Sequence, residues 1–154
     1  MYTIIPYCNG GEIFDRLDRR RRFTEDESRH FLRSILDGLE WLQRASLTHK
    51  DISLENIMVD DELTVIIDVG MCLRIPCADN GAQRHLINSQ PRCGKLYYMA
   101  PEVYNEEPFH GCAVDMWAVG VCLFIMRTGQ PSWERASRVD RRFRYCIMEI
   151  LPNI

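Results

Sequence analysis

The run Val114 to Arg127 constrains the fold of this chain more than any other feature, because it is apolar on nearly every side of a helix. Such a helix has no face to offer to water, so it is expected at the centre of a folded domain. Its longest uninterrupted apolar stretch, Met116 to Met126, has eleven residues. A bilayer-spanning helix needs about 20. The sequence therefore predicts a buried helix and no membrane association.

A second helix is predicted over residues 25–44. Thr24 and Glu27 form a capping box, in which a hydroxyl and a carboxylate satisfy the free amides at a helix start. Behind it, apolar residues recur with helical spacing at Phe31, Leu32, Ile35, Leu36, Leu39 and Leu42. A chain of 154 residues is long enough to build one compact domain on these two helices.

The remaining segments are shorter. Two apolar runs, Ile57 to Val59 and Leu63 to Ile67, flank three acidic residues and predict a tight β-hairpin. A helical turn is expected after Gly10-Gly11, and the arginine run at residues 19–22 is predicted to be its solvated end. Residues 69–98 show no sustained period, and a segment of that length without one is usually functional. We therefore expect a mainly α fold with one small hairpin.

Composition excludes several classes of protein. A net charge of −3 and a pI near 5.8 argue against a binder of nucleic acid or membrane surfaces. The seven cysteines are odd in number and form no CxxC pair, so neither a zinc site nor a disulfide framework is predicted. No signal peptide is visible at the N-terminus. A reducing compartment is the simplest expectation, so we predict a cytoplasmic protein and do not exclude the nucleus.

Polar motifs occur at the ends of the predicted elements. In chain order they are His49-Lys50-Asp51 with Asn56 five residues after Asp51, Asp68-Val69-Gly70, Ala100-Pro101-Glu102 and Asp115-Met116-Trp117. Taken singly, the first motif is explained by a loop with an Asx turn, and Asp68-Val69-Gly70 by a strand end and turn. Their common order is not explained in that way.

In order and spacing, these motifs resemble the signature set of the eukaryotic protein kinases: a catalytic loop, a D-F-G metal motif, and A-P-E after the activation segment. The stretch Tyr7 to Phe14 looks like the hinge of that family, and the resemblance covers nearly the whole chain. Tyr98-Met99-Ala100-Pro101-Glu102 is similar to the serine/threonine branch. The resemblance implies a kinase C-terminal lobe, ATP and Mg²⁺ as cofactors, and a protein substrate.

The resemblance also implies roles for single residues. Asp51 would accept or orient the proton of the substrate hydroxyl. Asn56 and Asp68 would ligate magnesium through hard oxygen atoms, with Asp68 carried at the end of the hairpin. The adenine and ribose would lie against the hinge and the hairpin, at Pro6, Cys8, Glu12 and Met58.

Three other residues are expected to be structural. In the family, the counterpart of Asp115 hydrogen-bonds the backbone of the catalytic loop, and His49 is expected to pack beneath that loop. Glu102 would pair with an arginine near the end of a complete kinase domain.

Two elements of the family are absent from residues 1–154. The sequence contains no G-x-G-x-x-G motif, and no lysine precedes Lys50. In the family, the N-terminal lobe supplies a glycine-rich loop and a strand lysine that hold the phosphates. We therefore expect residues 1–154 to be a partial kinase domain, without the N-terminal lobe and the terminal helices, and inactive on its own.

Two residues, Ser53 and Lys95, depart from the family in complementary ways. Serine/threonine kinases usually have a lysine where Ser53 stands, two residues after the catalytic Asp, and a threonine where Lys95 stands, after Gly94. Our hypothesis is that the Lys95 ammonium reaches the space beside Ser53 and restores a catalytic contact with Asp51. The alternative is a solvated lysine on the activation segment.

A further departure concerns regulation. Lys50 replaces an arginine that, in the family, captures a phosphate on the activation segment, and lysine offers only a point charge. Ser89 is the only serine or threonine between Asp68 and Glu102. It is the candidate phosphosite for an upstream kinase, and an unmodified loop serine is the alternative.

Three functions are compatible with this pattern to different degrees. The first is phosphoryl transfer from ATP to serine or threonine hydroxyls of a protein. The second is a non-catalytic, kinase-like binding module, either a pseudokinase piece or a truncated product. The third, a helical scaffold of another kind, explains none of the ordered motifs.

Overall fold

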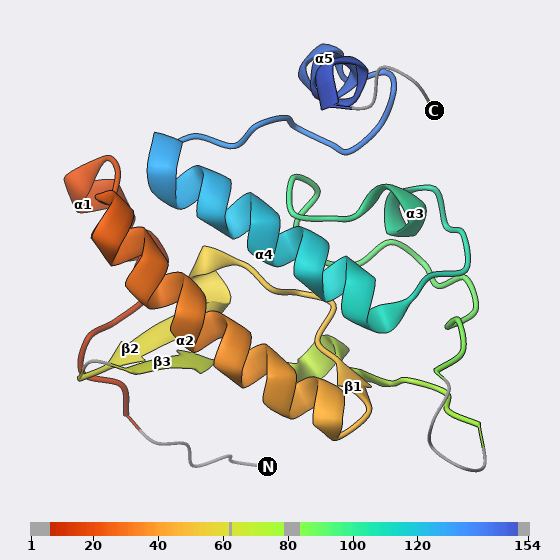
Figure 1. Ribbon diagram of the computed structural model, residues 1–154, viewed down its shortest axis with the longest axis horizontal. Coiled ribbons are helices and arrows are strands. Elements are labelled where there is room, and N and C mark those ends of the chain that lie inside the picture. The colour runs from red at the N-terminus through yellow and green to blue at the C-terminus, as the bar shows by residue number, and fades with distance from the viewer. Residues whose placement is uncertain (1–6, 62, 79–83, 151–154) are drawn as a thin grey trace.

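The computed structural model describes residues 7–61, 63–78 and 84–150. Figure 1 shows a mainly helical molecule in which α2 and α4 lie side by side over two very small sheets. The helices are α1 (Ile13–Arg20), α2 (Glu25–Arg44), α3 (Pro101–Tyr104), α4 (Gly111–Thr128) and α5 (Arg141–Ile150). The strands are β1 (Leu47–Thr48), β2 (Ile57–Asp60), β3 (Leu63–Ile66) and β4 (Leu73–Arg74), with short 3-10 turns at Leu54–Asn56 and Val69–Met71.

Helix α4 occupies the centre of the fold, as its apolar character predicts, and begins three residues earlier than expected. At its start, a Cβ added to Gly111 would lie 2.9 Å from Cβ of Thr48, so β1 and α4 approach more closely than a side chain at residue 111 permits. Within the described ranges, α4 is the one helix whose length and composition would allow a membrane crossing, and half of it is buried inside the structure.

Helix α2 confirms the predicted boundaries and the predicted capping box. Thr24 Oγ1 accepts from the amide of Glu27, and the Glu27 carboxylate accepts from the amide of Thr24. Its apolar face, centred on Ile35 and Leu39, packs against α4 and contributes to a core shared with α1 and β2. The arginine run at residues 19–22, which begins in the last turn of α1, is exposed, as predicted for a solvated helix end.

The two sheets are antiparallel pairs. Strands β2 and β3 pair with Ile57 opposite Ile66 and Met58 opposite Val65. Alternation buries Ile57 and Val59 in the core and turns Met58 to the opposite face. The second pair, β1 with β4, was not predicted, because two strands of two residues carry no readable period.

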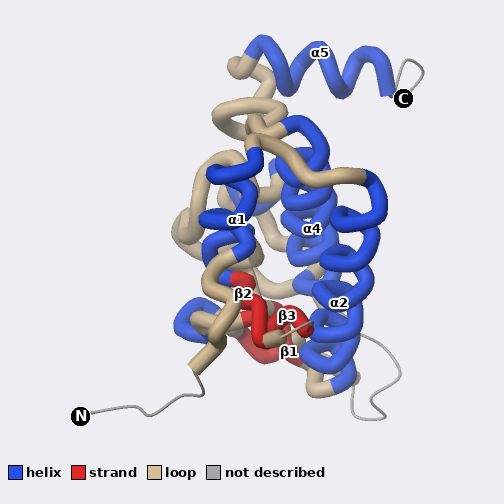
Figure 2. The backbone as a smooth tube through the Cα atoms, turned by 90° about the vertical axis from the view of Figure 1, so that its left-hand side faces the viewer, coloured by secondary structure: helices blue, strands red, loops and turns tan. Residues whose placement is uncertain are grey.

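Helix α5 was also not predicted, since we expected no helix after the central one. It is an arginine-rich segment, and among its residues 141–148, whose burial the structure describes, Phe143 alone is buried. Phe143 packs edge-on against Trp133, with ring centroids 5.1 Å apart, and Trp133 packs on Trp117 of α4 at 5.6 Å. Figure 2 shows α5 running across the direction of α2 and α4. These aromatic contacts with distant residues, rather than local periodicity, hold the helix in place.

Candidate active site

The catalytic loop, defined here as residues 49–56, rests on a single buried carboxylate near the start of α4. Asp115 is 1% exposed, and its two oxygens accept from the backbone amides of His49 and Lys50, each at 2.8 Å. The Thr48 hydroxyl lies 2.9 Å from the same carboxylate. Burial raises the pKa of Asp115, and these donors act in the opposite direction. The predicted structural contact of Asp115 is thus present, and it holds Lys50 at a left-handed φ of 69°.

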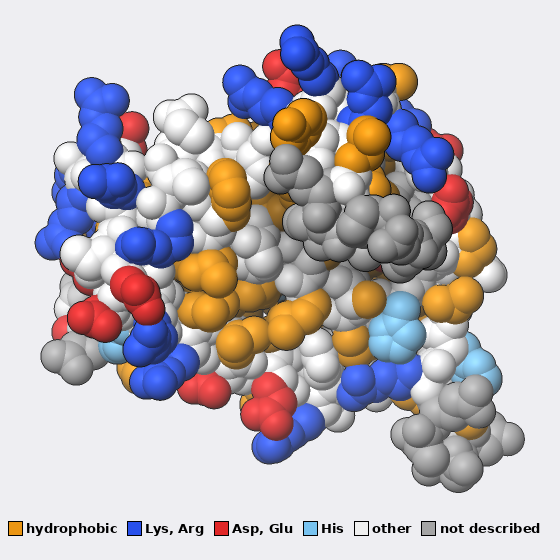
Figure 3. Space-filling model, turned by 45° about the horizontal axis from the view of Figure 1, so that its top comes forward, with side chains coloured by type: hydrophobic (Ala, Val, Ile, Leu, Met, Phe, Trp, Pro, Cys, Tyr) orange, Lys and Arg blue, Asp and Glu red, His pale blue; other side chains and the backbone are white. Residues whose placement is uncertain are grey.

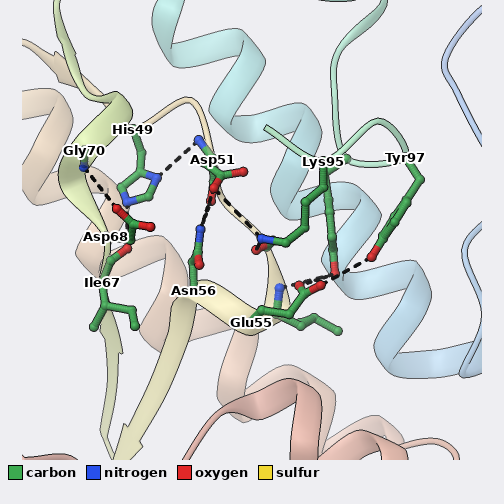
Figure 4. A network of polar contacts seen from close by, with 12 residues as sticks. His49, Asp51, Glu55, Asn56, Ile67, Asp68, Gly70, Lys95 and Tyr97 are labelled. Atoms are coloured by element: carbon green, nitrogen blue, oxygen red, sulfur yellow. Dashed lines mark hydrogen bonds and ion pairs between the residues drawn. The ribbon is translucent and has the colours of Figure 1, made fainter. Parts of the chain in front are cut away.

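His49 joins the catalytic loop to the end of β3. Its Nδ1 lies 3.3 Å from the amide of Asp51, and its Nε2 lies 3.0 Å from the carbonyl oxygen of Ile67. The amide can only donate and the carbonyl can only accept, so one neutral tautomer, with hydrogen on Nε2, satisfies both contacts. Figure 4 shows the ring between Asp51 and the segment that leads to Asp68. His49 is fully buried, in agreement with the structural role expected for it.

The side chain of Asn56 is hydrogen-bonded to Asp51. Nδ2 of Asn56 lies 2.8 Å from Oδ2 of Asp51 and 2.8 Å from its backbone carbonyl oxygen. The two amide hydrogens of Asn56 are therefore directed at Asp51, which leaves Oδ1 of Asn56 as an acceptor turned away from that residue. Both side chains are largely buried, with exposures of 9% for Asp51 and 8% for Asn56.

Asp68 follows β3 and is placed close to Asn56 by a backbone hydrogen bond of the preceding residue. The amide of Ile67 donates to the carbonyl oxygen of Asn56 at 2.9 Å, so Asp68 stands one residue beyond a backbone contact to Asn56. Asp68 is exposed and has a left-handed φ of 62°, and its carboxylate accepts from the amide of Gly70 at 3.3 Å. This conformation turns the chain out of β3 into the activation segment.

These donors suit magnesium in kind and in number. Asn56 Oδ1 and the Asp68 carboxylate are hard oxygen ligands, and magnesium is usually held by one or two protein oxygens together with phosphates and waters. Among the described residues, no cluster of three or more His, Cys, Asp or Glu side chains is arranged to hold a metal ion. The residues thus fit a metal that is shared with a nucleotide rather than one held by protein alone.

The predicted hinge pairs with the hairpin. The amide of Gly10 donates to the carbonyl of Val59 at 2.8 Å, and the amide of Val59 donates to the carbonyl of Gly11 at 2.9 Å. This ladder sets Glu12 opposite Met58, two residues that we assigned to the nucleotide site. Met58 and Val65 lie on the strand face opposite to the core, and Val65 is 41% exposed. The result is a small apolar face next to the hinge.

Two further hinge residues, Cys8 and Pro6, were also predicted to contact the nucleotide. Cys8 is half-buried, and its carbonyl oxygen accepts from the amide of Gly11 at 3.5 Å. Pro6 lies outside the described residues. Contacts of these two residues with a nucleotide remain predictions.

Lys95 lies where the exchange hypothesis requires it. Its ammonium donates to Oγ of Ser53 at 2.9 Å and lies 3.9 Å from Oδ2 of Asp51, within ion-pair range. The hypothesis would have been wrong had this nitrogen stood beyond that range. Ser53 is fully buried, whereas the Lys95 side chain is 32% exposed. The fully solvated lysine of the alternative is not what the structure shows.

Two residues assigned to regulation lie near one ring. The Lys50 ammonium is 5.8 Å from the ring centroid of Phe109, and Phe109 pairs through its backbone with Ile87, two residues before Ser89. Ser89 is exposed, and its hydroxyl bonds the carbonyl of Glu106. Glu102 is half-buried on α3, and the arginine partner expected for it remains a prediction.

Sequence reasoning missed one group of polar contacts. The hydroxyls of Tyr97 and Tyr98 lie 3.3 and 3.4 Å from the two oxygens of Glu55, and the amide of Leu54 donates to the Tyr98 hydroxyl at 3.2 Å. Burial raises the pKa of both phenols, that of Tyr97 to about 12. The position of Glu55, directly before Asn56 in the catalytic loop, was the only available signal.

Comparison with known proteins supplies an independent line of support. The model of the protein kinase domain matches residues 1–152. The chain is 35% identical over 147 residues to a RAC-beta serine/threonine-protein kinase of Xenopus laevis, covering 95% of this chain and 28% of that protein. It is 35% identical over 127 residues to NUAK family SNF1-like kinase 1 of Mus musculus, covering 82% and 18%. It is 31% identical over 150 residues to serine/threonine-protein kinase SAPK1 of Oryza sativa subsp. japonica, covering 96% and 42%. The chain thus spans less than half the length of these relatives.

Proposed function

Because this chain belongs to the protein kinase family, we propose that it serves phosphoryl transfer from ATP to serine or threonine hydroxyls of a protein substrate. The observation that carries the proposal is the hydrogen bond from the Asn56 amide to the Asp51 carboxylate. Asp115 accepts from the backbone amide of His49, and the His49 ring accepts from the backbone amide of Asp51. Phosphoryl transfer needs positioned oxygen ligands and a proton acceptor more than covalent help from the protein. The catalytic loop offers both within a few ångströms.

Each residue has a distinct task in this proposal. Asp51 accepts or orients the proton of the attacking hydroxyl, and Asn56 keeps its carboxylate turned toward the substrate. Asn56 Oδ1 and Asp68 would hold magnesium, and Met58 with Glu12 would hold the base and ribose. When bound, ATP would supply the phosphoryl group and magnesium would neutralise its charge.

A hollow of about 460 Å³ beside Tyr97 and Tyr98 supports a polypeptide as the phosphate acceptor. It lies between α1 and the end of α4, with Phe14, Leu17 and Pro131 among its apolar lining residues and Asp18 and Arg21 among its charged ones. Figure 3 shows arginine and lysine side chains around the edges of one face, with apolar side chains gathered across its middle. A chain segment with mixed apolar and charged side chains would match such a surface.

The test is transfer of labelled phosphate from ATP to a generic protein substrate in the presence of magnesium. Asp51→Asn should lower kcat by about 10²-fold or more, since a positioned base contributes that much. Asp37→Asn, an exposed change on α2, is the matched control and should leave kcat unchanged. Equal rates for the two variants would exclude Asp51 from the chemistry.

A second function, a non-catalytic kinase-like binding module, is favoured by one observation: residues 1–154 contain no G-x-G-x-x-G and no lysine before Lys50. On this ground we expect the 154 residues alone to transfer phosphate slowly at best. Magnesium-dependent protection by ATP in a thermal shift, without transfer, would support this second function. Neither protection nor transfer would remove nucleotide chemistry altogether.

A further inference from the structure

We propose that the positive charge of the transfer site is carried by the activation segment, on Lys95, and that docking of the turn at residues 94–98 therefore completes the site. The inference rests on the proposed function and concerns how that site is regulated. Ser53 is the positioning residue that receives the Lys95 side chain, and Asp51 is the residue on which its charge acts.

The first argument is the electrostatic setting of Asp51. The carboxylate receives an amide donor from Asn56 and has one ion-pair partner among the described residues, Lys95 at 3.9 Å. At this distance the ammonium stabilises the carboxylate, and it also lies next to the place where a phosphoryl group would meet the substrate hydroxyl. A third of the Lys95 side chain is exposed, so it stays accessible to such a ligand.

The second argument is the interchange of side chains with Ser53. The buried Ser53 hydroxyl accepts from the ammonium at 2.9 Å across 42 residues of sequence. The site therefore contains one hydroxyl and one ammonium both here, with Ser53 and Lys95, and in the usual family pattern, with a lysine at residue 53 and a threonine at residue 95. A lysine at residue 53 would place the positive charge on the catalytic loop itself. A lysine at residue 95 places it on the turn at residues 94–98, which must pack against that loop. The charge thereby depends on tertiary docking.

The third argument is that the turn at residues 94–98 is docked through several separate contacts. Gly94 has a left-handed φ of 89°, and a Cβ there would lie 2.9 Å from Oδ1 of Asp51, so its backbone lies directly against the carboxylate. The amide of Tyr98 donates to the carbonyl of Lys95 at 3.0 Å, which closes the turn. The backbone on both sides of Lys95 is thus fixed.

The far end of the turn is bound to the catalytic loop by the two tyrosines. Both hydroxyls bond Glu55, and that of Tyr98 also accepts from Leu54. The indole of Trp133 donates to the carbonyl of Tyr97 at 3.2 Å. Release of this end would carry Lys95 away from Asp51 while leaving Asp51, Asn56 and Asp115 in their places. The geometry thus separates a fixed proton acceptor from a removable charge.

The test is a set of exchanged variants of the protein expressed from its full reading frame. Lys95→Thr should lower kcat by about 10²-fold, by analogy with the loss of one charge-stabilising donor. Ser53→Lys alone should also lower it, because two ammonium groups then compete for one carboxylate. The double variant S53K/K95T should recover kcat to within about tenfold of the wild type, and Lys95→Arg should recover part of it. Arg33→Thr, on the exposed face of α2, is the control.

A second measurement tests docking itself. Tyr97→Phe with Tyr98→Phe loosens the turn, so it should lower kcat more in the wild type than in S53K/K95T, where the charge sits on the catalytic loop. Calorimetry should show weaker binding of a non-hydrolysable ATP analogue to Lys95→Thr, with ADP binding changed less.

The outcomes separate the two proposals. If the wild type transfers phosphate, an unchanged kcat in Lys95→Thr would overturn this inference alone. A fold-loss of kcat in S53K/K95T equal to the product of the two single fold-losses would do the same. So would equal tyrosine effects in the two backgrounds. Absence of transfer and of nucleotide binding in the wild type would overturn the proposed function, and this inference with it.

Discussion

The catalytic loop is held on one side by α4 and on the other by the turn at residues 94–98, and the two sides are built from different interactions. On the α4 side, Asp115 is 1% exposed and accepts from two backbone amides and a hydroxyl. On the other side, Lys95 is 32% exposed and its ammonium is 3.9 Å from Asp51. The Asp115 contact is buried and made to backbone amides, whereas the Lys95 contact is partly solvated and joins side chain to side chain.

This difference separates what fixes the fold from what completes the site. Removing a buried acceptor leaves donors without partners, which costs far more than the bond itself contributes. A partly exposed ion pair contributes little, because water replaces the lost partner. We therefore expect changes at Asp115 to lower the free energy of unfolding most, and changes at Lys95 to alter activity more than stability.

The largest expected effect is on the α4 side. Asp115→Ala leaves the amides of His49 and Lys50 and the Thr48 hydroxyl without an acceptor, and should lower the free energy of unfolding by about 3 kcal/mol or more. Urea denaturation measures the change. Asp37→Ala, at an exposed position on α2, should stay within about 0.5 kcal/mol of the wild type. Similar losses in the two variants would contradict the structural role of Asp115.

The next effect belongs to the tyrosines of the turn and appears at alkaline pH. Burial raises the pKa of Tyr97 to about 12 and also raises that of Tyr98, so the folded protein retains phenol protons that the unfolded chain releases near its ordinary pKa of about 10. Stability from these groups is complete below pH 10 and falls as the pH rises from about 10 to 12, since the folded state then binds more protons.

Chemical denaturation at fixed pH values measures this fall, and Tyr97→Phe with Tyr98→Phe should flatten it. The same steepness in that double variant would assign the effect to other groups.

A smaller effect is expected for Tyr98→Phe alone at neutral pH. The change removes the acceptor of the Leu54 amide and one donor to Glu55, which should cost about 1–2 kcal/mol. Tyr145→Phe is the control, since Tyr145 is 66% exposed on α5. A loss as large as that of Asp115→Ala would show that the two sides of the catalytic loop do not differ.

The smallest effect on stability is expected for Lys95→Met, at less than about 1 kcal/mol, because the pair with Asp51 is partly exposed. The midpoint of thermal unfolding should therefore move little, although kcat falls strongly. A fall in kcat accompanied by an equally large loss of stability would place Lys95 in the scaffold rather than in the transfer site.

The sequence predicted the parts of the fold that rest on local patterns. The capping box and apolar spacing located α2 to the residue, and the all-round apolar character located α4 to within three residues at its start. Helix α5 and strands β1 and β4 escaped prediction, since α5 depends on Phe143 meeting Trp133, and strands of two residues have no period. Such elements are set by tertiary contacts.

For the site, the ordered motifs indicated the catalytic residues but not their bonds. The resemblance to the family, which usually has a lysine at residue 53 and a threonine at residue 95, suggested that Ser53 and Lys95 had exchanged roles, and the structure places Lys95 Nζ 2.9 Å from Ser53 Oγ. The link from Glu55 to Tyr97 and Tyr98 escaped prediction, because a single acidic residue in a loop gives no sign of which distant hydroxyls it will meet.

The partial exposure of Lys95 has a chemical consequence. The chain has only two lysines, so a reagent directed at side-chain amines can modify only Lys50 and Lys95. In the docked turn the partly exposed Lys95 ammonium is held by the Ser53 hydroxyl, and we expect it to react faster with such a reagent once the turn leaves. The extent of acylation at residue 95, read by mass spectrometry, would therefore report the docked fraction directly, without any assay of turnover.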